Sequence, residues 1–367
     1  MSIKKKDWDK VKCMKSGIHL PSYPIKIGDN DLPTNAEKAE AFVDMFAKVS
    51  KTGYLPPDIK HYREIKERVD NQNKSSFNNS YSLQDINQEI TLEEMSKEIS
   101  LFRNENKAVG LDGISNQMLK HIPTNVLDFI HALFQKCWQS GILPSIWKES
   151  IVIPIHKKGK SKHEVNSYRP ISLTSHVCKL LERIVLKRLT YFCDKNQLIP
   201  TNQAGFRKNR NTTEHLVKLT THIKQQFSKR KNVLATFFDI HKAYDQVWHY
   251  RLLRKLETYN IHGNIFNYIA DFLMNRYIQV RINHTYSSRK YLDMGLPQGS
   301  ILSPLLFNIL MSDLPKKLSK NTYLAQFADD ICMWQKISIK TNRSKRWLKY
   351  IQINYQQELN QIGTFFK

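Results

Sequence analysis

Cysteine is scarce in this chain of 367 residues, which contains five. They are Cys13, Cys137, Cys178, Cys193 and Cys332, and they form no Cys-x-x-Cys pair and no Cys/His cluster with the spacing of zinc ligands. The odd number and the scattered positions argue against a disulfide framework, so we expect reduced, buried thiols. The sequence therefore favours a reducing compartment, the nucleus or the cytoplasm, without distinguishing between them.

Long apolar runs are also missing. No segment approaches the roughly 20 apolar residues of a membrane-spanning helix, and the first eight residues lack the apolar stretch of a signal peptide. Lys158-Gly-Lys-Ser161 is not a P-loop, because Pro154 stands where that motif requires its first glycine. The sequence thus predicts neither a membrane partner nor a P-loop nucleotide site.

Acidic residues are few compared with basic ones. In the whole chain, 33 Asp and Glu stand against 57 Lys and Arg, which gives a net charge of +24. From Lys148 to Lys231 there are 19 basic residues and 5 acidic ones, interleaved with aromatic residues such as Tyr168 and Phe206. A basic surface of this kind attracts a phosphate backbone. An ordinary solvated basic face is the alternative, but nucleic acid is the partner that this region favours.

Acids nevertheless stand at the ends of two apolar runs. Asp239 closes the run that begins at Val233, and Asp329 and Asp330 follow Phe327-Ala328. Short apolar, aromatic or β-branched runs are typical of buried strands. Carboxylates at strand ends could meet in space and hold Mg²⁺, which prefers oxygen ligands. The alternative is that they are turn acids, since Asp is common in turns beside strands.

Periodicity predicts several helices and strands. We expect helices at 35–50, 92–104, around 118–119, and at 126–138, 176–194, 216–227, 248–259, 261–275, 303–312 and 347–366. Strands are expected at 151–155, 233–239, 277–283 and 289–294, with a hairpin at 323–334 that carries Asp329 and Asp330 at its tip. The polar stretch 70–80 is typical of a linker.

Eight segments occur in an order that identifies a family. They are Lys107-Ala-Val-Gly-Leu-Asp-Gly-Ile-Ser115, Trp147-Lys148, Ile151-Val-Ile-Pro-Ile-His-Lys-Lys-Gly159, Tyr168-Arg-Pro-Ile-Ser-Leu173, Asn202-Gln-Ala-Gly-Phe-Arg207, the segment with Asp239, Gly295-Leu-Pro-Gln-Gly-Ser-Ile-Leu-Ser-Pro304 and Phe327-Ala-Asp-Asp330. Each alone is a weak signal, but together they resemble the reverse transcriptase of non-LTR (LINE-type) retrotransposons, most of all the jockey group.

The resemblance implies an α+β fold. It would consist of the fingers and palm of a right-hand polymerase, with a small antiparallel palm sheet backed by helices. The chain would divide into a connector region at residues 1–80, a helical N-terminal extension of the fingers at 81–145, and the fingers and palm at 146–367. No endonuclease, zinc knuckle or complete thumb accompanies these segments, so we expect a fragment of a mobile element's reading frame.

The same resemblance implies RNA-directed DNA synthesis by two-metal transfer of a nucleotide to a primer 3′-hydroxyl. Asp239, Asp329 and Asp330 would be the catalytic metal ligands, with Asp330 contributing less directly. The ions would be two Mg²⁺, with Mn²⁺ as a possible substitute. The partners would be an RNA template, a DNA primer and deoxynucleoside triphosphates. The alternative is a catalytically inactive, nucleic-acid-binding remnant of such an element.

Five further residues would bind the nucleotide. Lys157, Lys158 and Arg169 would hold the triphosphate, the arginine through a bidentate fork and the lysines as point charges. Tyr244 would pack under the sugar and exclude a 2′-hydroxyl, with a core aromatic as the alternative. The amide of Gln298 would contact the nucleotide, unless its loop is a plain turn.

Three neighbouring residues receive weaker assignments. Phe206 and Arg207 would touch the template by stacking and by phosphate contact, with a core position open for Phe206. Asp245 fits a helix cap or a salt-bridge partner better than a metal ligand.

Overall fold

The computed structural model describes residues 24–27, 30–51, 67, 85–102, 108–319, 321–337, 355–357, 359–360 and 362–363. By its internal contacts the chain divides into two compact units. The first comprises Met1–Tyr54, Lys60–Phe192 and Tyr244–Ser303, and the second comprises Leu55–Ile59, Cys193–Ala243 and Pro304–Lys367. The expected linker at 70–80 lies outside the described residues, and the sequence-based division at residues 80 and 145 stays a prediction.

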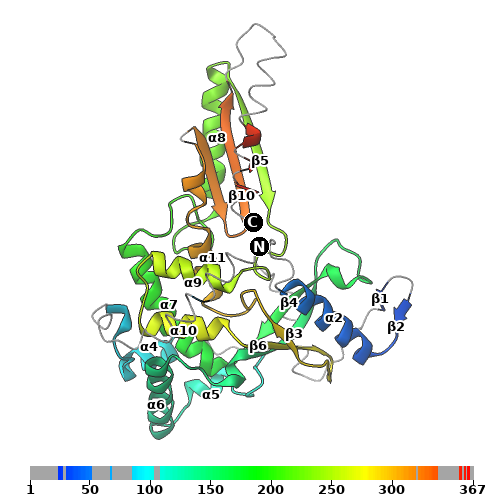
Figure 1. The fold of residues 1–367 in the computed structure, drawn as a ribbon, viewed down its shortest axis with the longest axis vertical. Helices are drawn as coiled ribbons and strands as arrows, with labels where there is room; N and C mark the ends of the chain where they lie inside the picture. Colours follow the sequence, from blue (N-terminus) through cyan, green and yellow to red (C-terminus); the bar gives the residue numbers. More distant parts are fainter. Residues whose placement is uncertain are drawn as a thin grey trace. The chain divides into compact units, whose positions relative to one another are not determined.

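The first unit contains a mixed five-stranded sheet (Figure 1). Its strands are β3 (Glu149–His156), β4 (Tyr168–Leu173), β6 (Arg276–Ile282), β7 (Thr285–Tyr286) and β8 (Lys290–Leu292). The order is β4-β3-β6-β7, with β8 also paired to β6. β3 and β6 run parallel, and the other pairs are antiparallel. A separate hairpin joins β1 (Ile25–Ile27) to β2 (Asn30–Leu32).

Helix α2 (Asn35–Val49) packs on this sheet. It begins with a capping box, in which the Thr34 side chain accepts a hydrogen bond from the Glu37 N–H and the Glu37 carboxylate accepts one from the Thr34 N–H. Phe42 is buried in one apolar cluster with Val152 and Val280 of the sheet. Burial of this apolar surface joins α2 to the unit.

The first unit contains further helices, two of which pack buried aromatic rings against each other. The further helices are α4 (Leu92–Ser100), α5 (Asn116–Lys120), α6 (Thr124–Ser140), α7 (His176–Lys195, to Phe192 in this unit), α9 (His249–Thr258) and α10 (Asn264–Leu273), with the 3₁₀ turns η3 (Asp85–Asn87), η4 (Ser145–Lys148) and η5 (Val165–Ser167). Trp138 of α6 and Tyr268 of α10 are fully buried, and their ring centroids lie 6.2 Å apart. Gly141 ends α6 in the left-handed conformation, at φ +66°.

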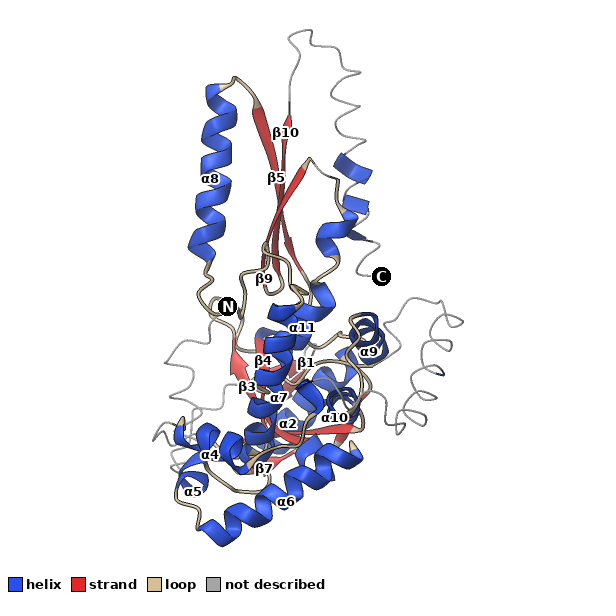
Figure 2. Cartoon of the chain, turned by 90° about the vertical axis from the view of Figure 1, so that its left-hand side faces the viewer, coloured by secondary structure: helices blue, strands red, loops and turns tan. Residues whose placement is uncertain are grey.

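The second unit contains a three-stranded antiparallel sheet in the order β5-β10-β9. The strands are β5 (Asn232–Asp239), β9 (Thr322–Phe327) and β10 (Asp330–Ile337), accompanied by α8 (Thr212–Ser228), α11 (Ser303–Met311) and the turn η6 (Leu314–Lys317). α8 runs along this sheet in both views (Figures 1 and 2). Trp334 of β10 donates from Nε1 to Nδ1 of His222 at 2.9 Å and stacks on Tyr323 of β9. These contacts fix α8 to one face of the sheet.

The α+β class expected from the sequence is confirmed, as are most of its elements. The expected helix at 261–275 is shorter, because it begins at Asn264, and the helix at 347–366 lies largely outside the described residues. The sequence did not predict β4, because its first residues, Tyr168-Arg-Pro, are polar and include a proline. Pro170 is tolerated there because β4 is an edge strand. No helix in the described part of the chain is long and apolar enough to cross a membrane.

Candidate active site

Three carboxylates meet at one end of the three-stranded sheet. Asp239, the last residue of β5, pairs directly with Asp330, the first residue of β10. Side chains of directly opposed residues share a face, with Cβ atoms about 4.5–5.5 Å apart. Asp329 lies in the tight turn between β9 and β10. The structure therefore brings Asp239 together with Asp329 and Asp330, which lie far from it in the sequence.

The cluster is electrostatically unfavourable. Asp239 and Asp330 are exposed, whereas Asp329 is half-buried. Burial raises the pKa of the Asp329 carboxyl, and the negative charges of Asp330 and Asp239 raise it further. Among the described residues, no three His, Cys, Asp or Glu side chains are already arranged to hold a metal ion. The role of the three acids as metal ligands stays a prediction.

The turn that carries Asp329 is held by a buried glutamine. Oε1 of Gln203 accepts hydrogen bonds from the Ala328 N–H at 3.0 Å and from the Gly205 N–H at 2.8 Å. Ala328 has a left-handed backbone, at φ +57°, a conformation that alanine adopts reluctantly. The Gln203 hydrogen bond offsets that cost and so fixes the position of Asp329.

The glycine of the same segment allows it to approach the turn closely. A Cβ on Gly205 would lie 2.3 Å from the Ala328 nitrogen. The Gly205 carbonyl accepts a hydrogen bond from Nδ2 of buried Asn308 at 2.9 Å. The Arg207 guanidinium donates to the carbonyls of Pro200 and Ile199, so it supports its own loop, while Phe206 is exposed and not in the core.

A pocket opens beside the carboxylates. It has a volume of about 380 Å³ and lies between α8 and the sheet, and Asp239 and Asp330 are among its lining residues. The rest of its wall is mainly apolar and includes Leu216 of α8 and Phe237 of β5, both exposed. The pocket therefore offers a ligand apolar contact next to the charged end of the sheet.

In the first unit, the loop that contains Gln298 is tied to the segment that contains Tyr244. The Leu296 N–H donates to the Tyr244 carbonyl, and the Gly295 N–H donates to the Val247 carbonyl, both at 2.8 Å. Nε2 of buried His249 donates to the Gly295 carbonyl at 2.7 Å. Two motifs that are separate in the sequence are thus joined by hydrogen bonds.

The loop that contains Gln298 also forms hydrogen bonds with β4 and with Glu182. The Ser172 N–H of β4 donates to the Gln298 carbonyl at 2.8 Å. Gly299 has φ +148°, and a Cβ there would lie 2.2 Å from the backbone carbonyl oxygen of Ser172, so only glycine fits. The buried carboxylate of Glu182 accepts from the Ser300 hydroxyl at 2.5 Å and from the Ile301 N–H at 2.8 Å. Glu182 thereby fixes the segment that leads into α11.

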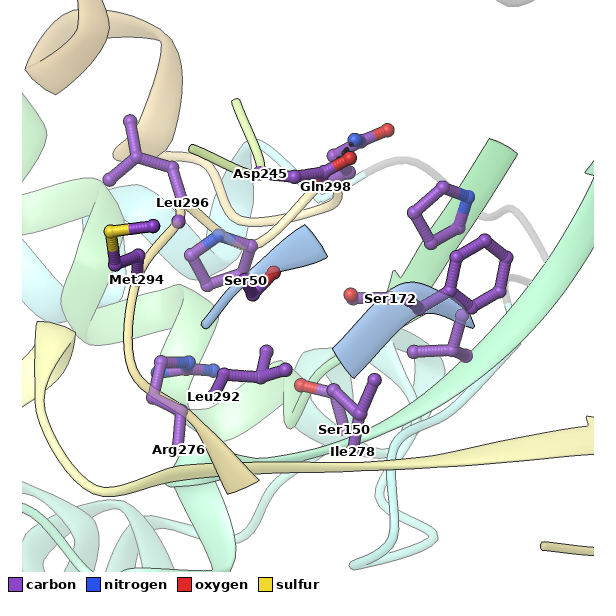
Figure 3. A pocket seen from close by; sticks show the side chains of 15 residues that line it. Ser50, Ser150, Ser172, Asp245, Arg276, Ile278, Leu292, Met294, Leu296 and Gln298 are labelled. Carbon is purple, nitrogen blue, oxygen red and sulfur yellow. Dashed lines mark hydrogen bonds between the residues drawn. The ribbon is translucent and has the colours of Figure 1, made fainter. Parts of the chain in front are cut away.

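The Gln298 side chain has a partner of its own. Nε2 of Gln298 donates to Oδ1 of Asp245 at 2.7 Å. Both residues line a small cavity of about 40 Å³ under the loop, together with Ser150, Ser172 and the buried Arg276 (Figure 3). Asp245 therefore contacts a candidate nucleotide-binding residue, and its expected role as a cap or salt-bridge partner stays a prediction.

The expected phosphate-binding residues lie on the β3–β4 hairpin of the first unit. Lys158 is exposed in the connection between the strands, and Arg169 is half-buried opposite Ile155. Nζ of Lys157 donates to the Asn166 carbonyl at 2.9 Å. Lys157, Lys158 and Arg169 thus belong to one hairpin, and their contact with a triphosphate stays a prediction.

The eight predicted site residues fall into two groups. Asp239, Asp329 and Asp330 belong to the second unit, and Lys157, Lys158, Arg169, Tyr244 and Gln298 belong to the first. The sequence did not reveal the residues that support them, chiefly Gln203, Glu182 and His249. For Glu182 a signal existed, since a single carboxylate interrupts the apolar face of a predicted helix.

Comparisons with known proteins show the family of the chain. The profile of the reverse transcriptase (RNA-dependent DNA polymerase) family matches residues 155–360. The chain is 29% identical over 330 residues to the probable RNA-directed DNA polymerase from transposon BS of Drosophila melanogaster. The aligned region covers 88% of this chain and 35% of that protein. The chain is 30% identical over 310 residues to the RNA-directed DNA polymerase from mobile element jockey of the same organism, which covers 83% of this chain and 32% of that protein. The chain spans about a third of the length of these relatives.

The substitution Gly205→Ala should disturb the turn that carries Asp329. The new Cβ would meet the backbone nitrogen of Ala328 at 2.3 Å, and overpacking of this kind costs about 1–3 kcal/mol. Urea denaturation should show this loss in the free energy of unfolding. Gly363→Ala is the matched control, because nothing lies within 4 Å of a Cβ there; equal stabilities of the two variants would contradict the close contact.

The free energy of unfolding should decrease as the pH falls, because of His249. Burial lowers the pKa of this imidazole from 6.5 to about 4, so the unfolded chain binds a proton more readily than the folded one. The contribution of neutral His249 to the free energy of unfolding is complete above pH 6.5 and is lost as the pH falls toward about 4. Between about pH 7.5 and about pH 5, the wild type should lose about 2 kcal/mol more than His249→Gln.

Urea denaturation at the two pH values measures this difference. His121→Gln, at an exposed histidine, should retain the pH dependence of the wild type. Identical losses in the wild type and in His249→Gln would show that the ring is not held neutral.

Proposed function

Because the chain belongs to the reverse transcriptase (RNA-dependent DNA polymerase) family, we propose that it extends a DNA primer on an RNA template. The observation that carries this proposal is the meeting of Asp239, Asp329 and Asp330 at the end of one sheet. Its substrates would be deoxynucleoside triphosphates, and the reaction would join the primer 3′-hydroxyl to the α-phosphate with release of pyrophosphate.

The donor set suits divalent metal. Three carboxylates provide the hard oxygen ligands that Mg²⁺ prefers. Burial raises the pKa of Asp329, and the negative charges of Asp330 and Asp239, which a cation would neutralise, raise it further. Asp239 and Asp330 are exposed, so a change of rotamer can turn both toward a shared ion. Two bound Mg²⁺ ions, or Mn²⁺ in their place, would neutralise charge on the attacking and leaving oxygens.

The remaining side chains position the nucleotide. Lys157, Lys158 and Arg169 would neutralise the triphosphate, which needs no covalent help from the protein. Tyr244 would exclude a 2′-hydroxyl, and Gln298 would contact the nucleotide from a loop whose backbone is fixed by hydrogen bonds on both sides. We assign the proposed fingers to the β3–β4 hairpin and the proposed palm to the β5-β10-β9 sheet.

A second function, nucleic-acid binding without synthesis, is supported by the exposed basic connection between β3 and β4. Lys158, Lys160 and Lys162 are all exposed there. Such a surface binds phosphate backbones independently of the carboxylates. Binding and synthesis are therefore measured separately.

The purified chain should extend a DNA primer annealed to an RNA template in the presence of Mg²⁺. Asp329→Asn and Asp239→Asn should each reduce extension by about 100-fold or more, since changes merely adjacent to a metal site already cost 10- to 100-fold. Asp128→Asn, at an exposed residue of α6, is the control. Gel analysis of the extended primer measures the rate.

Fluorescence anisotropy of a labelled template–primer separates the two functions. Its affinity should be unchanged in the Asp variants and should fall by about 100-fold between about 50 and about 200 mM salt if about four phosphates are contacted. Binding without extension by the wild type would leave only the second function. Extension that survives in both Asp variants would contradict the carboxylate site.

Tyr244→Ala should relax the choice of sugar. A large ring at this position leaves no room for a 2′-hydroxyl, and its removal would open that space. The ratio of ribonucleotide to deoxynucleotide incorporation should rise by roughly 100-fold, where about 1.4 kcal/mol is tenfold. Single-nucleotide insertion kinetics measure the ratio. An unchanged ratio in a variant that still extends primers would return Tyr244 to a purely structural role.

A further inference from the structure

The pocket between α8 and the three-stranded sheet differs in charge from the rest of the chain. Its volume is about 380 Å³, and two carboxylates, Asp239 and Asp330, stand in its wall without any Lys or Arg among the described residues that line it. The whole chain has 57 Lys and Arg against 33 Asp and Glu, so an acidic pocket is unusual on this protein. Its charge therefore favours a cationic ligand over an anionic one.

The rest of the wall is apolar and partly aromatic. Phe237 of β5 is 73% exposed and Leu216 of α8 is 59% exposed, and Phe327 and Trp334 add two further aromatic rings. A ligand that covers Leu216 and Phe237 would remove their apolar surface from water. Aromatic faces also attract cations. The wall therefore suits a flat, apolar ligand body that carries a positive charge.

His215 adds a hydrogen-bond acceptor to this pocket. Its side chain is buried, and Nε2 lies 3.0 Å from the Gln326 carbonyl oxygen, which only accepts, so Nε2 carries the proton. Burial lowers the pKa of His215, so the ring is neutral at neutral pH and Nδ1 is an acceptor. This Nδ1 has no hydrogen-bond partner within the described part of the chain. The polar groups of the pocket thus call for a ligand with N–H donors.

We propose that this pocket binds an aromatic cation, a flat ring system that carries its positive charge on N–H groups. The rings lie between α8 and the sheet, against Leu216 and Phe237, and the N–H groups face Asp239 and Asp330. A free phosphate is a poorer ligand, because its negative charge meets two carboxylates. This binding does not require DNA synthesis, and the cation would compete with metal ions for the same carboxylates.

Two probes with the same fused rings test the ligand class. Proflavine is cationic at neutral pH and has N–H donors, whereas acridine is neutral and has none. Fluorescence anisotropy of each probe is measured against the full chain, freed of nucleic acid and kept in EDTA, so that neither nucleic acid nor metal ions compete. Proflavine should bind with a Kd of about 100 µM, a value in the range for a ligand of this size, and acridine about tenfold more weakly.

Two neighbouring residues of α8 locate the binding. Leu216 lines the pocket and Val217 does not, although they are similarly exposed, at 59% and 57%. Leu216→Lys places a positive charge in the wall and should weaken proflavine binding by about tenfold. Val217→Lys, the matched control, should change it by less than about twofold, because salt screens exposed charges beyond about 8 Å.

A third variant tests the carboxylates. Asp330→Asn should reduce the preference for proflavine over acridine by about threefold, because it removes one of the two negative charges. Its affinity for acridine should stay the same. Asp330 is exposed, so the substitution leaves the core intact. Thermal denaturation checks the folding of every variant, and Phe237→Lys, at a residue that is 73% exposed, replaces Leu216→Lys if that variant is unfolded.

Four results would overturn the inference. Equal affinities for proflavine and acridine would show that the rings alone bind. Equal losses in Leu216→Lys and Val217→Lys would place the probe outside the pocket. An unchanged preference in Asp330→Asn would exclude the carboxylates, and no saturable binding of proflavine would exclude the site. None of these measurements involves primer extension, so they leave the proposed function to its own test.

Discussion

Asp239 faces Asp330 because β5 and β10 pair antiparallel in one register, and a slip of one residue would turn one acid to the opposite face of the sheet. The register is held over the whole length of both strands, from Asn232 opposite Ile337 to Asp239 opposite Asp330. Packing of α8 against Trp334 and Tyr323 adds a second constraint. A long, well-packed pairing is therefore what places two like charges side by side at its end.

Like charges at a strand end repel, so the turn next to them needs support that does not come from the acids. Gln203 supplies it from a segment distant in the sequence, through the Ala328 N–H. In the first unit, Glu182 and His249 support the Gln298 loop in the same way. In both units, buried side chains hold the turn or loop that carries a candidate site residue.

The sequence predicted the elements that carry the acids because the signal there is local. An apolar run ended by an acid specifies both a strand and the position of its carboxylate. β4 was missed because its polar start and Pro170 are tolerated only at a sheet edge, which is a property of the whole sheet. The parallel pairing of β3 with β6 joins segments that are far apart in the chain, and no local pattern indicates such a pair.

The hydrogen bonds that support the site residues could not be predicted from the sequence for a related reason. Nothing in the residues around Gln203 indicates that its amide will meet Ala328, and nothing around Asp245 indicates Gln298. The ordered motifs marked these segments as important without showing what each side chain contacts. Propensity and periodicity describe one segment at a time, whereas a hydrogen bond between two loops depends on how both are packed.

The net positive charge of the chain and the three clustered carboxylates have opposite effects on a phosphate ligand. A chain with a net charge of +24 attracts a polyanion, yet its three site carboxylates would repel the same phosphates at close range. Divalent cations would resolve this conflict, because they would be attracted to the acids and would in turn attract phosphate oxygens. The exposed lysines between β3 and β4 would then gather nucleic acid, while the carboxylates would hold the ions that act on it. Carboxylates in a basic protein are thus compatible with phosphate binding if cations neutralise them.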